Sequence, residues 1–208
     1  MNFTQPIVFI LATMLTACVT TSSPKAHFYT LASTNTKSQI AQSSAAPIAI
    51  EVLPINVPER LKRPQLVITN KNSAELKILE QDRWASSFND ELQDAFVSGL
   101  SNQLNAIDVS RGGRVASQPT YRIAITLQQF SATPGEQVQA HFGWTITRLA
   151  ADARENKAFS CQATFSKAVG NNLNDVVKGV QETVAEAIQA ISSNVNSLNN
   201  GEIGKCNG

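Results

Sequence analysis

The chain has 208 residues, of which 42% are hydrophobic, and its 17 lysine and arginine residues against 16 aspartate and glutamate residues leave a formal net charge of +1. This composition is typical of one soluble domain, and the near-zero charge lacks the electrostatic attraction that non-specific nucleic-acid binding needs. The longest apolar run, residues 7–15, is shorter than the roughly 20 residues of a membrane-spanning helix. We therefore expect neither a nucleic-acid-binding protein nor a polytopic membrane protein.

The amino terminus has the pattern of a lipoprotein signal peptide over residues 1–17. A short polar start precedes the apolar run, and small residues follow it, which is the order of a secretory signal. The segment Leu15-Thr16-Ala17-Cys18 resembles the bacterial lipobox, in which the cysteine thiol receives diacylglycerol, the chain is cut before the cysteine, and the new amine is acylated, typically with palmitate. No lysine or arginine precedes Lys25, which departs from that pattern. An ordinary signal peptide with an incidental cysteine, or an uncleaved anchor, is the alternative.

A lipid on Cys18 determines where the mature chain resides. Two or more acyl chains hold a protein firmly in a bilayer. Val19 stands where lipoproteins retained in the inner membrane have aspartate, so the lipobox resemblance implies the periplasmic side of the outer membrane of a Gram-negative bacterium. Residues 18–27 then form a lipidated tether, of which the part after Cys18 spans at most about 30 Å. We expect a single periplasmic domain over residues 28–208.

Two further cysteines, Cys161 and Cys206, suit an oxidising compartment, and we predict a disulfide between them. The alternative is a buried free Cys161 beside a disordered Cys206, because the sequence does not show that the two sulfurs meet. Neither cysteine lies in a C-x-x-C pair, and His27 and His141 are the two histidines of the chain. The sequence therefore predicts no metal site and no cofactor besides the covalent lipid.

Short extended segments and one amphipathic helix occupy the first half. We expect strands near residues 27–31, 48–53, 65–69 and 76–79, and a mobile polar loop at about residues 32–46. The helix is predicted from apolar residues that recur every four positions, namely Phe88, Leu92, Phe96, Leu100 and Leu104. Its other face, predicted to meet water, contains Asp90, Glu91, Gln93, Asp94 and Asn102.

Three alternating strands and a long helix make up the second half. The strands are predicted near residues 121–128, 138–146 and 158–167, and the helix near residues 173–198, capped by Asn171 or Asn172. This order predicts an α+β fold with a largely antiparallel sheet and two helices packed on one face. The uncovered face of the sheet would be polar and would contain Arg122, Thr126, Gln128, His141, Thr145 and Thr147.

Several segments together resemble the PqiC/YmbA family, the lipoprotein auxiliary components of ABC-type and MCE-type lipid transport systems. The resemblance rests on Cys18, the strand beginning at Phe28, the segment Leu61-x-Arg63-Pro64-x-x-Val67, and Trp84 before a helix. It covers nearly the whole mature chain. Lys62 and the two serines after Ala85 depart from it, because acidic residues are usual at those places in the family.

The turn containing Arg60, Lys62 and Arg63 is a small cationic cluster held between Pro58 and Pro64. Its functional interpretation is contact with acidic lipid headgroups or with an acidic partner surface, and the alternative is a solvated turn. Trp84 is best explained as a core anchor. Phe28 and Tyr29 suit strand packing, with membrane contact as the alternative.

No nucleophile elbow, phosphate-binding loop, zinc-protease motif or dinucleotide-binding motif occurs in the sequence, so we expect no enzyme. The resemblance implies an accessory subunit that works with an MCE-type protein and its permease and ATPase, supports transport of phospholipid or another lipophile, and maintains envelope integrity. Assembly with further copies of itself is part of this expectation. A structural lipoprotein of another outer-membrane complex, or a periplasmic small-ligand-binding lipoprotein, are the alternatives.

Overall fold

The computed structural model describes residues 24–32, 48–71, 73–113, 118–150, 156–202 and 204–206. The predicted signal peptide, Cys18, most of the tether and nearly all of the loop predicted at residues 32–46 lie outside the described residues. Within the described part of the chain, no helix combines the length and the hydropathy that crossing a membrane requires.

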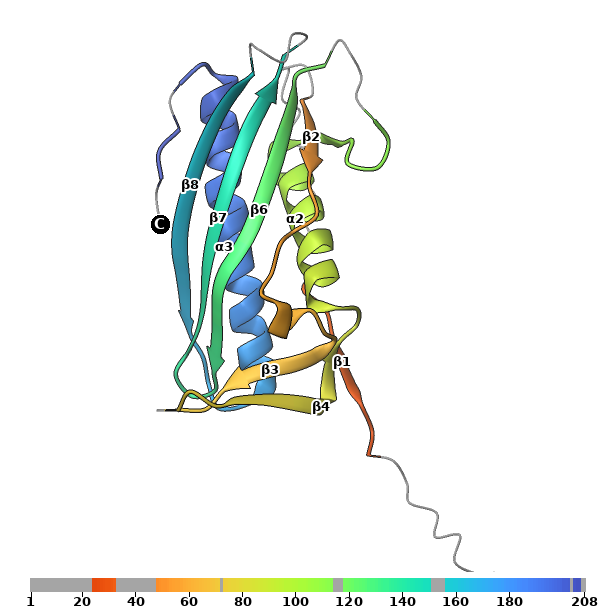
Figure 1. The fold of residues 1–208 in the computed structure, drawn as a ribbon, viewed down its shortest axis with the longest axis vertical. Coiled ribbons are helices and arrows are strands. Elements are labelled where there is room, and N and C mark those ends of the chain that lie inside the picture. The colour runs from red at the N-terminus through yellow and green to blue at the C-terminus, as the bar shows by residue number, and fades with distance from the viewer. Residues whose placement is uncertain are drawn as a thin grey trace, which may run out of the picture.

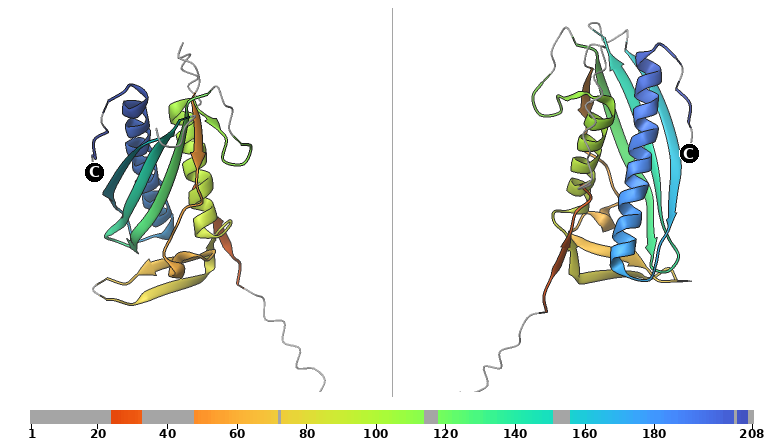
Figure 2. Two further views of the ribbon diagram at one scale, coloured as in Figure 1. Left: turned by 45° about the horizontal axis from the view of Figure 1, so that its top comes forward. Right: turned by 180° about the vertical axis from the view of Figure 1, so that it is seen from behind.

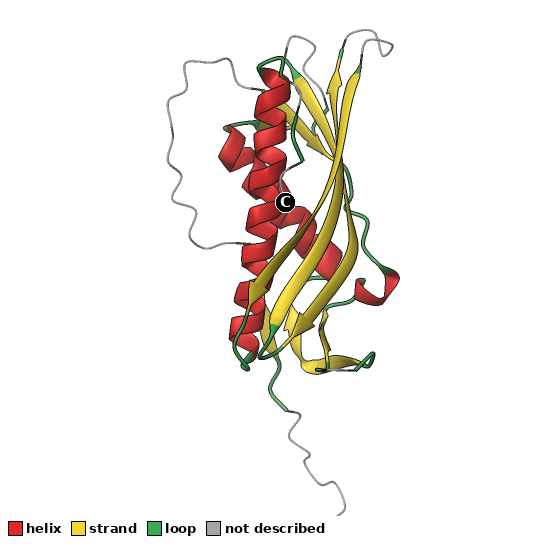
Figure 3. Cartoon of the chain, turned by 90° about the vertical axis from the view of Figure 1, so that its left-hand side faces the viewer, coloured by secondary structure: helices red, strands yellow, loops and turns green. Residues whose placement is uncertain are grey.

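The body of the molecule is a five-stranded sheet with two helices on one face (Figures 1 and 3). The strand order is β5-β2-β6-β7-β8. The strands are β2 (Ala49–Val52), β5 (Ile107–Asp108), β6 (Thr120–Thr133), β7 (Gln137–Leu149) and β8 (Lys157–Ala168). The helices are α2 (Phe88–Leu104) and α3 (Leu173–Asn199). Figure 3 shows the helices on one side of the molecule and the long strands on the other.

A second, three-stranded sheet lies across the lower end of the molecule in Figure 1, and Figure 2 shows it from two further sides. Its order is β1-β4-β3, with β1 (His27–Tyr29), β3 (Gln65–Thr69) and β4 (Leu76–Trp84). A short 3-10 helix, η2 (Glu59–Leu61), precedes β3. The strand predicted near residues 76–79 is therefore longer than expected and ends at Trp84.

The predicted α+β class and the two helices on one face are confirmed, but both sheets are mixed rather than purely antiparallel. Strand β2 pairs in parallel with β5 and β6, and β1 pairs in parallel with β4. Parallel neighbours need a long crossover, and β3, β4 and α2 lie in the chain between β2 and its two partners. Strands β6, β7 and β8 are antiparallel neighbours, as their alternation predicts.

The core forms where the apolar face of each long strand meets the helices. Side chains at alternate positions of β7, such as Phe142 and Ile146, are at most 2% exposed. Phe142 packs edge-to-face against Phe96 of α2, with ring centroids 5.4 Å apart. Helix α3 begins at the predicted cap, where the Asn172 side chain accepts a hydrogen bond of 2.9 Å from the backbone N–H of Asp175.

Strand β6 contains a bulge that the sequence alternation does not reveal. Leu127 pairs with Phe142 and Gln129 with His141, so Gln128 is an extra residue in β6. Such a residue shifts the inward positions by one. Leu127 is buried before the bulge, and Phe130 packs against the core after it.

One prediction for α2 is wrong, because Glu91 is only 7% exposed and does not face water. Its carboxylate accepts hydrogen bonds of 2.9 Å from the backbone N–H of Leu31 and from the Thr30 hydroxyl, and bonds of 3.1 and 2.9 Å from the N–H and hydroxyl of Ser86. A buried carboxylate needs such partners. Glu91 therefore fastens the segment after β1 to the start of α2.

The carboxyl-terminal tail returns to the body beside β8. Cys161 and Cys206 form a disulfide with their Cα atoms 5.5 Å apart. Asn194 of α3 accepts a 3.0 Å hydrogen bond from the Trp144 indole and donates a 2.8 Å bond to the carbonyl of Lys205. The tail is thus held by one covalent link and by one buried amide.

Candidate functional site

The face of the five-stranded sheet that points away from the helices is polar. All six side chains predicted for it lie at exposed or half-buried positions. Some of the polar groups there pair across strands: Arg122 donates to Glu51 at 3.0 Å, and Thr145 lies 2.9 Å from Ser160.

One part of this face is hollowed where η2 approaches β6, β7 and β8. We name it the Arg60 hollow, and its volume is about 460 Å³. It is lined by Arg60, Gln129, Phe130, Ser131, Gln139, His141 and Thr164. The cationic turn and the uncovered sheet face, which the sequence offered as two separate surfaces, therefore meet in one place.

Backbone pairing after β2 brings Arg60 to the sheet. The N–H of Asn56 donates to the carbonyl of Ile125 at 3.2 Å, and the N–H of Leu127 donates to the carbonyl of Asn56 at 2.8 Å. The chain then turns through η2, where Leu61 is buried with 3% of its surface exposed. Because Leu61 is buried in the core, the preceding Arg60 is left at the sheet surface, next to the residues that follow the bulge in β6.

The lining of the hollow favours a negatively charged ligand group. Arg60 is the one permanent charge among its lining residues, and no aspartate or glutamate lines it. Within the described chain Arg60 has no carboxylate partner, whereas Lys62 pairs with Glu59 at 2.9 Å. The Nε atom of Arg63 is buried without a hydrogen-bond partner and does not line the hollow. Of the three predicted cationic residues, only Arg60 is placed to receive a ligand.

His141, which was predicted on the polar face of the sheet, lies in the lining of the hollow. Its Nδ1 atom is 2.7 Å from the hydroxyl of Thr164 on β8. The neighbouring amides Gln129 and Gln139 supply further donors and acceptors. Sequence reasoning missed Gln129, Ser131, Gln139 and Thr164. Alternation alone marks Gln139 and Thr164 as outward, but the bulge hides the orientation of Gln129 and Ser131.

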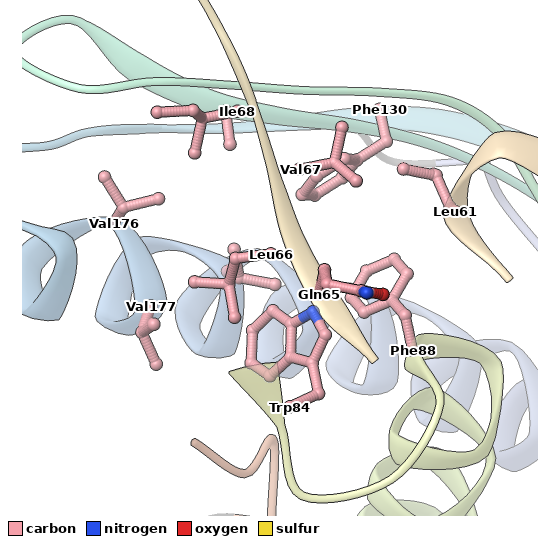
Figure 4. A pocket seen from close by; sticks show the side chains of 12 residues that line it. Leu61, Gln65, Leu66, Val67, Ile68, Trp84, Phe88, Phe130, Val176 and Val177 are labelled. Atoms are coloured by element: carbon pink, nitrogen blue, oxygen red, sulfur yellow. The ribbon is translucent and has the colours of Figure 1, made fainter. Parts of the chain in front are cut away.

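A second cavity, drawn in Figure 4, lies between β3, α3 and β6 and is apolar. Its lining includes Leu61, Leu66, Trp84, Phe88 and Val177. Its free volume is about 10 Å³, which is the room that about one water molecule needs. A pocket between helix and sheet thus exists where a small-ligand binder would have one, but as it stands it holds no ligand larger than water.

Trp84 is a core anchor, as the sequence suggested. It is 5% exposed, and its ring stacks on Phe88 with centroids 5.4 Å apart. Its backbone N–H donates to the carbonyl of Pro64 at 2.7 Å, and the N–H of Phe88 donates to the carbonyl of Arg63 at 3.2 Å. The segment that carries the family resemblance therefore joins β3 to α2.

No group of three or more histidine, cysteine, aspartate or glutamate side chains that could hold a metal ion occurs among the described residues.

In the small sheet, His27 lies 3.1 Å from Asp82, and the Tyr29 hydroxyl donates to the same carboxylate at 3.3 Å. Burial and then the charge of Asp82 raise the pKa of Tyr29 above its usual value. These contacts stabilise β1 against β4.

Two solved crystal structures have folds similar to that of this chain. One crystal structure, of an uncharacterized protein, matches with a TM-score of 0.61 and 16% identity over 82% of this chain and 99% of the other. A second, of the protein XCC0632 from Xanthomonas campestris, matches with a TM-score of 0.54 and 13% identity over 75% of this chain and 88% of the other. At these identities the likeness shows the fold alone.

No curated protein matches the sequence. Residues 29–192 match the family described as ABC-type transport auxiliary lipoprotein component. This match begins at the last residue of β1 and includes the cationic turn, all the other strands, α2 and most of α3. The chain belongs to the family of ABC-type transport auxiliary lipoprotein components.

Proposed function

We propose that this chain is a non-enzymatic accessory lipoprotein of an MCE-type and ABC-type transport system that moves phospholipid or another lipophile across the envelope. The observation that carries the proposal is the family match over residues 29–192. The Arg60 hollow supports it with a charged, otherwise unpartnered contact point. In this role the chain binds a partner protein and carries out no chemistry.

The proposal includes an anchor. Cys18 carries the lipid after removal of residues 1–17, and the domain works on the periplasmic side of the outer membrane. A tether of residues 18–27 keeps the domain near its bilayer, so a partner in the same envelope meets it at a high effective concentration and a weak interface suffices. Intact-mass measurement of the purified protein tests this part, since a chain that starts elsewhere or lacks acyl mass contradicts it.

The partner contact is proposed at the Arg60 hollow. A guanidinium group binds a carboxylate through two parallel hydrogen bonds, which gives direction as well as attraction. The surrounding amide and hydroxyl groups then complete the hydrogen bonding of an acidic segment of the partner. We propose an MCE-type subunit as that partner, with further copies of this chain assembled around it.

Charge reversal at two neighbouring positions tests the contact. Arg60→Glu removes the cation of the hollow, whereas Lys62→Glu changes the net charge equally at a residue that does not line it. Both side chains are exposed, so both variants keep the fold and the anchor. Affinity capture from crosslinked envelopes should recover the transport subunit with wild type and Lys62→Glu but lose it with Arg60→Glu. Equal capture by all three proteins would contradict the proposed contact.

A further inference from the structure

Large apolar side chains that remain exposed are concentrated at one end of the molecule. In the described chain they are Phe28 at 66%, Leu76 at 41%, Ile78 at 40% and Ile107 at 48% exposed. The first three belong to β1 and β4 of the three-stranded sheet, and only Ile107, in β5, lies elsewhere. Scattered exposed apolar residues are ordinary, but several of them on one small sheet suggest a contact surface.

The chain enters the domain at this same end. The described residues before β1 project past the three-stranded sheet at the lower end of Figure 1, and the same projection is visible in Figure 2. Pro24, the first described residue, follows Cys18 by six positions. Six residues span at most about 20 Å. A lipid on Cys18 therefore holds this sheet, and not the far end, close to the bilayer.

Part of β4 has a free edge on the same side. β1 pairs only with Asp82–Trp84, and β3 covers the other edge of β4. The remaining stretch, residues 76–81, contains Leu76, Lys77 and Ile78, all exposed. A free strand edge has unpaired backbone groups, which the polar headgroup region can hydrogen-bond but the hydrocarbon core cannot.

The charges of this end also suit a headgroup region. Lys25 and Lys77 are exposed and take part in no ion pair within the described chain. Long lysine side chains lie with their methylene groups on apolar surface and their ammonium groups among polar heads. Glu75 and Glu80 lie on the same strand or next to it. The attraction is therefore mainly apolar, with the lysines adding contacts to anionic lipids.

We propose that the three-stranded sheet docks on the surface of the bilayer, with Phe28, Leu76 and Ile78 in its interfacial region. This proposal depends on the lipid anchor of the proposed function. Because the tether after Cys18 is short, the bilayer is the surface that the sheet meets. Docking directs the opposite end of the molecule, which contains Ile107, away from the bilayer. It also fixes the height of the Arg60 hollow above the membrane.

Two single-tryptophan additions test the docking. The full chain, purified from envelopes with its lipid, is reconstituted into vesicles of phosphatidylethanolamine and phosphatidylglycerol with brominated or plain acyl chains. Bromine quenches nearby indoles, and because the native Trp84 and Trp144 emit in every variant, the quenching of the added indole is taken as the difference from wild type. Ile78→Trp reports the docked sheet, and Ile107→Trp is the matched control, an exposed apolar position at the other end. Leu76→Trp replaces Ile78→Trp should that variant misfold.

We expect bromine to quench the added indole of Ile78→Trp at least about twice as strongly as that of Ile107→Trp, because an interfacial side chain lies within roughly 10 Å of the acyl boundary. Equal quenching at both positions, or quenching at neither, overturns the docking. Intact mass and vesicle flotation report the anchor separately. A lipidated protein that floats with vesicles but shows no difference between the two variants therefore refutes the docking and leaves the proposed function standing.

Discussion

The two sheets of this chain bury their apolar side chains to very different extents. In the five-stranded sheet, Tyr121, Ile123 and Ile146 are 0% exposed beneath the two helices. In the three-stranded sheet, Leu76 and Ile78 keep about 40% of their surface exposed. The larger sheet completes its core within the domain, whereas the smaller sheet leaves apolar surface for an external contact. The fully buried apolar side chains and the exposed ones are thus concentrated in different sheets of one chain.

Polar contacts add to the apolar packing of Leu66 and Trp84 in joining the small sheet to the body. Glu91 receives hydrogen bonds from the segment after β1, and the Gln181 side chain of α3 donates to the carbonyl of Thr30 at 2.9 Å. Lys71 after β3 pairs with Glu136 of the β6–β7 turn at 3.0 Å. The comparison therefore predicts that core substitutions act on the whole domain, while changes to these ties act locally.

The largest effect is expected in the body. Phe142→Ala should lower the free energy of unfolding by about 3–5 kcal/mol, since it removes a buried ring that packs on Phe96. Leu76→Ala, at an exposed position of the small sheet, should change it by less than about 0.5 kcal/mol. Urea unfolding of the two variants measures both. Similar losses from both variants would mean that the Leu76 side chain is packed within the domain rather than exposed.

Loss of the disulfide should have the second-largest effect on the free energy of unfolding. The bond closes a loop of 45 residues, and its loss through Cys206→Ser should cost about 2–4 kcal/mol. A thiol count on denatured, unreduced protein from the periplasm checks that the bond forms, and urea unfolding measures its contribution. Two free thiols from Cys161 and Cys206 would rule it out.

Glu91→Ala should have a smaller and more local effect. It leaves the N–H groups of Leu31 and Ser86 without their partner, which should cost about 1.5–3 kcal/mol. Hydrogen exchange should then accelerate in residues 27–31 more than in β7. Glu91→Gln, which keeps one acceptor oxygen, is the control and should lie between Glu91→Ala and wild type. Uniform acceleration over the whole domain would contradict the local role.

Local periodicity in the sequence predicted most of the five-stranded sheet and its two helices. It did not predict the polar contacts that join the small sheet to them. The alternation of β7 and the four-residue spacing of α2 each depend on neighbouring residues, so the sequence placed Phe142 and Phe96 correctly in the core. Glu91 was assigned to water because its burial depends on Leu31 and Ser86, and Leu31 is separated from it by 60 positions. Long-range partners of this kind leave no periodic signal.

The candidate site was predictable only in part for the same reason. The cationic turn and the polar sheet face were each visible from sequence, but their meeting depends on the pairing of Asn56 with β6 and on the extra residue Gln128. Neither feature alters composition or alternation enough to be detected in advance. Lys62 and Arg63 therefore looked equivalent to Arg60 until the fold separated them.

The smallest effect on stability is expected at the exposed ion pair between Lys71 and Glu136. Lys71→Ala should lower the free energy of unfolding by less than about 1 kcal/mol, because the pair with Glu136 is solvent-exposed and screened by salt. Urea unfolding at low and high salt measures it, and the difference between Lys71→Ala and wild type should shrink at high salt. A loss that salt does not reduce would indicate a role beyond charge pairing.

Site-specific photo-crosslinking in intact envelopes tests the central claim, that the Arg60 hollow binds a subunit of a transport system. A photoreactive residue at Gln139 lies in the lining of the hollow, and one at Gln189, an exposed position of α3 with the same native side chain, is the control. We predict an adduct with an MCE-type or permease subunit from position 139, its loss in the Arg60→Glu background, and no such adduct from position 189. An absent adduct at position 139, or one unchanged by Arg60→Glu, would contradict the account.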